Sequence, residues 1–167
     1  MAYRNKTYAA FDADSDIHYY RLMTAWKQND NTAFNFHDAH DLNNIMSWSS
    51  EETVKRRLRE RMNNTKVFVL LVGASTKHLY KYVRWEVVEA QARNLPIIAV
   101  NLNMSRGADY DRLPPVVRDD LSVSVPFSPR ILQHALEAWP ADHYAKRRAG
   151  EKGAFHYVES TYRSLGM

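Results

Sequence analysis

Two unbroken runs of apolar residues lie in the middle of the chain. Val67 to Val72 and Ile97 to Val100 are rich in β-branched side chains and show no polar alternation, which is typical of strands buried on both faces. The residues between them are sufficient for one helix, in which Val83, Val87 and Ala90 recur at helical spacing. A strand, a helix and a strand with short joints predict a βαβ crossover in a parallel sheet.

Shorter apolar runs at 7–11, 34–36 and 123–127 predict three more strands. Helices are predicted between the strands wherever a capping residue or a proline precedes apolar residues at helical spacing. These helices run from Asp14 or Ser15 to about Asn29, from a capping box of Ser49 and Glu52 to about Asn63, and from Pro129 through Trp139, with one further turn between Leu113 and Leu121. Five alternating strands predict an α/β, flavodoxin-like, doubly wound fold with a mostly parallel sheet and helices on both faces.

The length of the chain favours one domain, because 167 residues can bury about two-thirds of the unfolded surface. We expect residues 1–140 to form that domain. The tail at 141–167 is charged, but Phe155, Tyr157 and Tyr162 give it apolar side chains. We therefore expect the tail to pack on the same domain as a C-terminal extension.

Composition narrows the classes of function. Cysteine is absent, so the sequence offers no disulfide frame or thiolate metal site, which suits the cytoplasm. No apolar run has the length of a membrane span, and residues 1–6 lack the apolar core of a signal peptide. Lysine and arginine outnumber aspartate and glutamate by only 23 to 19, which allows an anionic ligand without favouring nucleic acid. We expect a cytoplasmic protein that binds neither membranes nor nucleic acid.

The joint after the first central strand is a candidate ligand site. Gly73-Ala74-Ser75-Thr76 consists of small residues at the carboxyl edge of the sheet, where open α/β folds bind ligands. Glu86 lies near the start of the following helix, so its carboxylate is expected close to that edge. From the residues alone, the commoner interpretation of Glu86 is a solvated charge paired with Arg93 or Lys81.

Other polar clusters favour ordinary structural roles. Asp12, Asp14 and Asp16 follow the first strand, and helix capping with solubility explains them better than a bound cation. His37 and His40 are of metal-ligand type, but no third ligand cluster accompanies them. We therefore predict no metal site.

Three short segments carry a resemblance to a known family. Tyr82 to Glu86 has the pattern aromatic-Val-Arg-aromatic-Glu on the helix after a strand that ends in Gly-x-Ser, and this resembles the TIR domain superfamily. Phe11-Asp12 after the first strand and Leu95-Pro96-Ile97-Ile98 make the chain similar, more narrowly, to the TIR-like proteins of Thoeris antiphage defence systems. The similarity extends from about Lys6 to Phe127.

The resemblance implies an enzyme that cleaves NAD+ between ribose and nicotinamide, with Glu86 as its catalytic residue. NAD+ is then a substrate, and no cofactor is required. Some members convert the ADP-ribose part into a cyclic or conjugated signal that activates a downstream effector. TIR active sites often form across a subunit contact, so we expect a homo-oligomer with a composite site, which the loop from Asp38 to Trp48 is placed to complete. The candidate substrate-binding residues are Phe11, Asp12, Trp48, Gly73, Ser75 and Trp85.

Several alternatives remain open from sequence. Phe11 and Trp48 are more often core residues than platforms for a ring. A TIR-like signalling adaptor would work by self-assembly or partner binding and would not need Glu86. A phosphoacceptor receiver shares the strand order, but it requires an aspartate after the third strand, where this chain has Gly73. The hypothesis of a nucleic-acid-binding protein has even less support, because the sequence contains no motif of stacking aromatic and basic residues.

Overall fold

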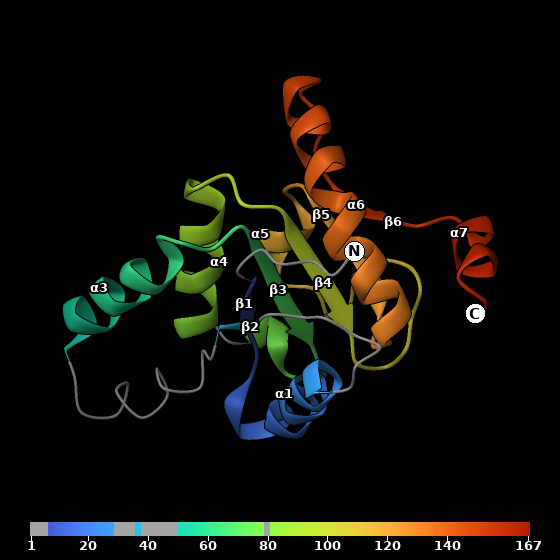
Figure 1. Ribbon diagram of the computed structural model, residues 1–167. Coiled ribbons are helices and arrows are strands. Elements are labelled where there is room, and N and C mark those ends of the chain that lie inside the picture. Colours follow the sequence, from blue (N-terminus) through green and yellow to red (C-terminus); the bar gives the residue numbers. More distant parts are fainter. Residues whose placement is uncertain (1–6, 29–35, 38–49, 79–80) are drawn as a thin grey trace.

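The computed structural model describes residues 7–28, 36–37, 50–78 and 81–167 (Figure 1). Within these residues a single, wholly parallel sheet has the order β2-β1-β3-β4-β5-β6. The first five strands have the order of the flavodoxin-like fold, so the predicted fold class is confirmed. The strands are β1 (Thr7–Ala10), β2 (Phe36–His37), β3 (Val67–Val72), β4 (Ile97–Asn101), β5 (Ser122–Pro126) and β6 (Ala154–His156).

The sheet has one strand more than the five that the sequence predicted. The additional strand, β6, comes from the tail and pairs in parallel with β5. Gly153 precedes it with φ of +115°, a conformation that favours glycine, and exchanges backbone hydrogen bonds with the chain on either side of Leu121. Three residues are too few to show a period in the sequence, so the pattern of apolar positions could not reveal this strand.

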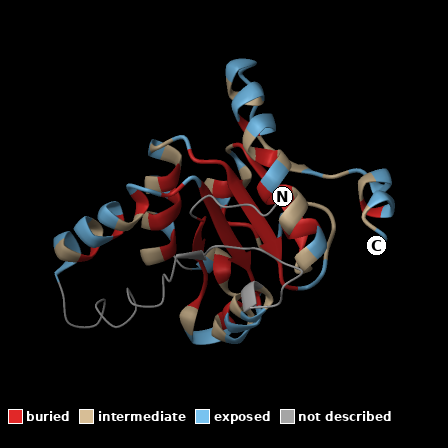
Figure 2. Cartoon of the chain, in the orientation of Figure 1, coloured by how far each residue is buried: buried red, intermediate tan, exposed pale blue. Residues whose placement is uncertain are grey.

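Helices cover both faces of the sheet (Figures 1 and 2). Alternation along the strands separates two cores: Val67, Val69 and Leu71 of β3 face α1 and α6, whereas its other residues face α3, α4 and α5. The bounds are α1 (Ala13–Gln28), α3 (Glu51–Met62), α4 (Tyr82–Ala92), α5 (Pro115–Arg118), α6 (Pro129–Arg148) and α7 (Glu159–Ser164), with a 3-10 turn η1 (Thr76–His78). No helix in the described ranges is long and apolar enough to cross a bilayer.

Two predicted helix starts were wrong in detail. Helix α1 begins at Ala13, and its capping side chain is that of Asp12, whose Oδ1 accepts the Asp14 N–H at 3.1 Å. Helix α3 is capped by Ser50, whose Oγ accepts the Thr53 N–H at 3.3 Å. Ser49, the cap predicted for this helix, lies outside the described residues.

Helix α6 does not end at Trp139 but continues through Pro140 to Arg148. Proline removes one helical hydrogen bond, yet contacts beyond it hold the second half in place. His143 is fully buried and its Nε2 lies 3.0 Å from Asn94 Oδ1. Arg147 donates to both carboxylate oxygens of Asp120, at 2.7 and 2.9 Å. These tertiary contacts outweigh the local effect of proline.

Candidate active site

Glu86 lies inside the protein, between α4 and the sheet. Its side chain is 6% exposed, and Oε1 accepts a hydrogen bond of 2.7 Å from the hydroxyl of Tyr8 on β1. Val83, Val87 and Ala90 pack on the sheet along the same helix, and this packing turns Glu86 inward. The position predicted for Glu86, beside the apolar stripe and near the start of the helix, is confirmed.

The interpretation of Glu86 as a solvated, paired charge is wrong. Arg93 pairs instead with Glu89, at 2.9 Å, and Lys81 pairs with Glu51, also at 2.9 Å. Both proposed partners are therefore engaged on the surface, while Glu86 is buried with an uncharged tyrosine.

Burial changes the acidity of this pair. Loss of water raises the pKa of Glu86 from 4.5 to about 7, and the hydrogen bond from Tyr8 opposes part of that rise. Burial, followed by the charge of Glu86, raises the pKa of the Tyr8 hydroxyl well above 10. Near neutral pH the tyrosine is a donor, and the carboxyl group of Glu86 is divided between its charged and neutral forms.

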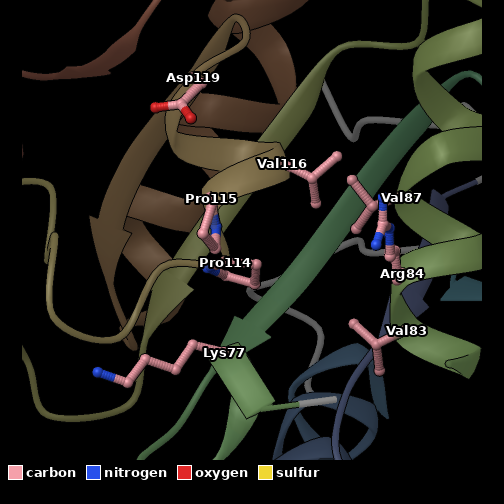
Figure 3. Close-up of a pocket in the computed structure, with 8 residues that line it drawn as sticks. All are labelled: Lys77, Val83, Arg84, Val87, Pro114, Pro115, Val116 and Asp119. Atoms are coloured by element: carbon pink, nitrogen blue, oxygen red, sulfur yellow. The ribbon is translucent and has the colours of Figure 1, made fainter. Parts of the chain in front are cut away.

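A groove on the other side of α4 does not include Glu86. It lies between α4 and α5 and is lined by Val83 and Val87 from the first helix and by Val116 from the second (Figure 3). Glu86 is directed to β1, away from α5. The groove and the buried carboxylate are therefore two separate features.

A second polar group lies at the carboxyl edge of β1 and β3. The Ser75 hydroxyl donates to Asp12 Oδ2 at 2.6 Å and lies 3.5 Å from the Ser15 hydroxyl. Asp12 is 7% exposed, so its carboxylate is held by these contacts rather than by bulk water. The structure thus brings together two of the predicted substrate-binding residues, Asp12 and Ser75, although they are 63 positions apart.

Gly73 lies at the same edge of the sheet, directly after β3, and its lack of a Cβ atom allows the Asp16 carboxylate to approach its backbone. Its N–H donates to Thr76 Oγ1 at 2.8 Å, and a Cβ atom at Gly73 would lie 2.4 Å from Asp16 Oδ2. Asp16 is 6% exposed, and its Oδ2 has no hydrogen-bond partner among the described residues. Burial, and next the charge of Asp12, raise the pKa of Asp16. Sequence reasoning missed Asp16 as a site residue; its only signal is its spacing of four from Asp12.

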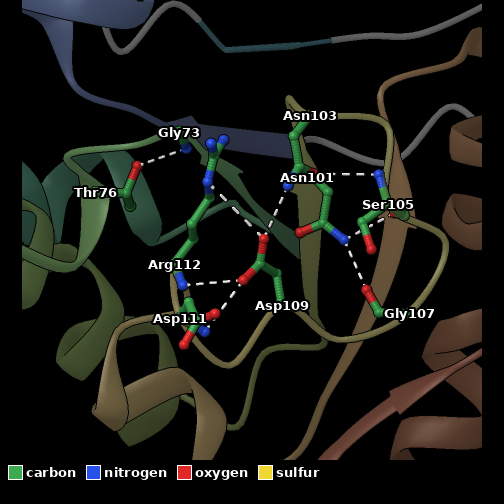
Figure 4. Close-up of polar contacts among 9 residues, drawn as sticks. All are labelled: Gly73, Thr76, Asn101, Asn103, Ser105, Gly107, Asp109, Asp111 and Arg112. Atoms are coloured by element: carbon green, nitrogen blue, oxygen red, sulfur yellow. Dashed lines mark hydrogen bonds and ion pairs between the residues drawn. The ribbon is translucent and has the colours of Figure 1, made fainter.

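The loop after β4 closes the same edge of the sheet (Figure 4). The Asn101 amide donates to the carbonyl oxygens of Ser105 and Gly107, at 2.9 and 2.8 Å, and so fixes the turn. Asp109 accepts from the Arg112 N–H at 3.1 Å and lies 3.9 Å from its guanidinium. Burial and the charge of Asp12 raise the pKa of Asp16, and the charges of His18 and Arg112 oppose a smaller part of that rise.

The aromatic candidates have other neighbours. Phe11 is 8% exposed and stacks on Tyr20 with ring centroids 4.7 Å apart, within the core under α1 and α6. Trp85 is half-buried beside α3, with Lys55 Nζ 4.4 Å from its ring centroid. Trp48, with the loop predicted to meet a second subunit, lies outside the described residues.

The fold and these residues define a TIR-like α/β domain with a glutamate in the helix after β3. Residues 8–107 match the family described as Thoeris protein ThsB, TIR-like domain. The matched segment covers more than half of the chain and contains Tyr8, Asp12, Gly73 and Glu86. The chain belongs to this family of TIR-like defence proteins, and the resemblance stated from sequence is confirmed.

Proposed function

We propose that this chain is an NAD+ nucleosidase that breaks the bond between ribose C1′ and nicotinamide, with Glu86 as the catalytic carboxylate. The observation that carries this proposal is the buried Glu86, 6% exposed and with a pKa raised to about 7, in a chain of the ThsB TIR-like family. Groups with strongly shifted pKa values concentrate at sites of chemistry.

The reaction needs little from the protein because nicotinamide in NAD+ already carries positive charge. When the C1′–N bond breaks, the electron pair leaves with nicotinamide, which departs neutral and needs no proton. The ribose becomes oxocarbenium-like, and an ionised Glu86 beside it stabilises the positive charge. Water, or a hydroxyl group of the substrate, then adds to C1′ and releases one proton. A carboxylate with a pKa of about 7 can accept that proton.

Neighbouring residues support this role. Tyr8 donates to Oε1 of Glu86 and so fixes the orientation of the carboxylate. We assign Asp12 and Ser75, with the backbone at Gly73, to the ribose and phosphate groups, because carboxylate, hydroxyl and amide groups meet there at the carboxyl edge. Trp85, the residue before Glu86, is the remaining candidate on α4. Phe11 and Trp48 stay predictions from sequence.

The product and the partners belong to the same proposal. Membership of the ThsB TIR-like family suggests that NAD+ cleavage yields a signal derived from ADP-ribose. A downstream effector would sense this signal in defence against phage. On the same basis we propose that the protein is cytoplasmic and forms a homo-oligomer. Its active site would then be completed by a second subunit. The chemistry of C1′–N cleavage requires no resident cofactor or metal.

The test is nicotinamide release from NAD+ by concentrated protein, measured by chromatography. Glu86→Gln keeps the size of the side chain and its ability to accept from Tyr8, but removes the charge. We expect release to fall at least about 100-fold, the usual scale for one charge-stabilising group. Glu89→Gln is the matched control, because Glu89 lies on the same helix and pairs with Arg93 at the surface. Equal release by parent and Glu86→Gln would exclude Glu86 as the catalyst. No release by any folded form would favour the adaptor.

A further inference from the structure

The groove between α4 and α5 is a formed cavity of about 360 Å³ (Figure 3). That volume is within the range of small-molecule sites in proteins. Its lining combines valines and prolines with three charged side chains: Lys77, Val83, Arg84, Val87, Pro114, Pro115, Val116 and Asp119. None of Glu86, Tyr8, Asp12 and Ser75 is among these residues, so the groove is separate from the candidate active site.

The walls of the groove are apolar and held in place. Val83 and Val87 are anchored in the core, 5% and 0% exposed. On the opposite wall the proline rings restrict the backbone, and the Gln91 amide donates to the Val116 carbonyl at 2.6 Å, which ties α5 to α4. A preformed groove with aliphatic walls favours an apolar group, such as an aromatic ring.

The charges at the groove favour an anion. Neither the Lys77 ammonium nor the Arg84 guanidinium forms an ion pair or a hydrogen bond within the part of the chain that the structure describes. The carboxylate that lines the groove, Asp119, is engaged by Arg118 at 3.1 Å. The two cations are therefore available to a ligand, while the negative charge is partly neutralised. Lysine and arginine together are well suited to phosphate oxygens.

We propose that this groove binds a mononucleotide-like molecule, in which a phosphate group is joined to an aromatic base. The base lies between the valines and prolines, and the phosphate binds Arg84 beside the valine wall. Figure 3 shows the Lys77 ammonium directed away from Arg84, so Lys77 reaches the same phosphate by turning its flexible side chain. The proposal does not depend on NAD+ cleavage, because it uses neither Glu86 nor the carboxyl-edge residues. Val83 and Val87 lie on the helix that also carries Glu86, so a ligand in the groove would contact that helix on a different side from the carboxylate.

The probe is AMP, titrated into the full chain by calorimetry, beside adenosine and inorganic phosphate. We expect AMP to bind at least tenfold more tightly than either part alone, because only AMP supplies both the ring and the charge. The double substitution Lys77→Gln/Arg84→Gln should weaken AMP at least tenfold and leave adenosine nearly unchanged. The control is Arg56→Gln/Arg57→Gln, which removes two charges from an exposed face of α3 and should not change the affinity.

A second variant tests the apolar wall. Val116→Trp places a large side chain in the groove without touching Glu86 or Tyr8, and circular dichroism checks that it folds. We expect it to abolish AMP binding, whereas Glu86→Gln should leave AMP binding intact. Absence of AMP binding by the parent protein would overturn the proposal. So would binding that survives both groove variants, or binding that Glu86→Gln removes, because AMP would then occupy the active site.

Discussion

The two faces of the sheet are covered in different ways. On one face the 20-residue helix α6 and the 16-residue α1 enclose an apolar core around Trp139. On the other face three shorter helices lie side by side, and α5 has only four residues. Short helices cannot cover a sheet completely, and this face contains both the groove and the buried Glu86. One layer therefore encloses a continuous apolar core, while the other combines a core of its own with a buried carboxylate and a groove.

The largest expected effect is a loss of folding stability, and it is tested by replacing one tryptophan on each face of the sheet. Trp139 is 2% exposed, so Trp139→Ala should lower the free energy of unfolding by about 3–5 kcal/mol through cavity formation. Trp85 is half-buried over α3, so Trp85→Ala should cost no more than about half as much. Urea unfolding measures both. Equal losses would show that the two layers contribute alike and would remove the contrast between them.

Glu86→Gln should stabilise the folded protein. The folded state binds the proton of Glu86 more tightly than the unfolded state, so the stability contributed by this group is present below pH 4.5 and is lost as pH rises through about 7. Each pKa unit is worth about 1.4 kcal/mol, so the neutral glutamine should gain about 3 kcal/mol at pH 8 and almost nothing at pH 4. Unfolding of both proteins at the two pH values checks this. A gain of the same size at pH 4 would show that burial of the charged carboxylate is not the cause.

Gly73→Ala should be costly for steric reasons. The new methyl group would lie 2.4–2.9 Å from the Asp16 carboxylate, which is too buried to move freely, and we expect a loss of about 1–3 kcal/mol. Gly107→Ala is the control, because nothing lies within 4 Å of a Cβ there, and it should change stability by less than about 0.5 kcal/mol.

A double-mutant cycle then identifies the clash. Asp16→Ala removes the carboxylate that meets the new methyl group, so Gly73→Ala should cost much less in that background. Thermal or urea unfolding of the four proteins gives the coupling. Additive effects would mean that Gly73 is required for a reason other than the close approach of Asp16.

The smallest expected effect is that of Tyr8→Phe. The substitution keeps the buried ring and removes the hydroxyl whose hydrogen bond lowers the pKa of Glu86. The pH at which nicotinamide release is half-maximal should therefore move upward, with release retained at pH 9. Tyr144→Phe, at an exposed position on α6, should leave the profile unchanged. A downward movement with Tyr8→Phe would contradict the direction of this hydrogen bond's effect.

Much of the fold could be predicted because its signals are local. Continuous apolar runs identified β3 and β4, and helical spacing placed Val83, Val87 and Glu86 correctly on α4. The failures had nonlocal causes. Helix α6 continues past Pro140 because His143 and Arg147 form hydrogen bonds with residues that are distant in sequence. Strand β6 forms because it pairs with the outer edge of β5.

The candidate site was predictable only in part for the same reason. The family pattern indicated Glu86, but its partner Tyr8 is 78 positions away, and no spacing rule could connect the two. The pairing of Asp12 with Ser75 requires the ends of β1 and β3 to meet at one edge, which is consistent with the predicted doubly wound sheet, but the sequence did not predict this contact. The close approach of Asp16 to Gly73 depends on side-chain packing that no sequence pattern records.

The most direct test of Glu86 as the catalyst is the pH dependence of nicotinamide release from NAD+ between pH 5 and 9. With ionised Glu86 as the catalyst, kcat/KM should rise with pH and reach half its maximum near pH 7, which corresponds to the pKa of Glu86 in the free protein. The midpoint for kcat should be lower, because the positive nicotinamide ring favours the charged carboxylate in the complex. A rate independent of pH over this range, or the same profile in Glu86→Gln, would contradict catalysis by the ionised Glu86.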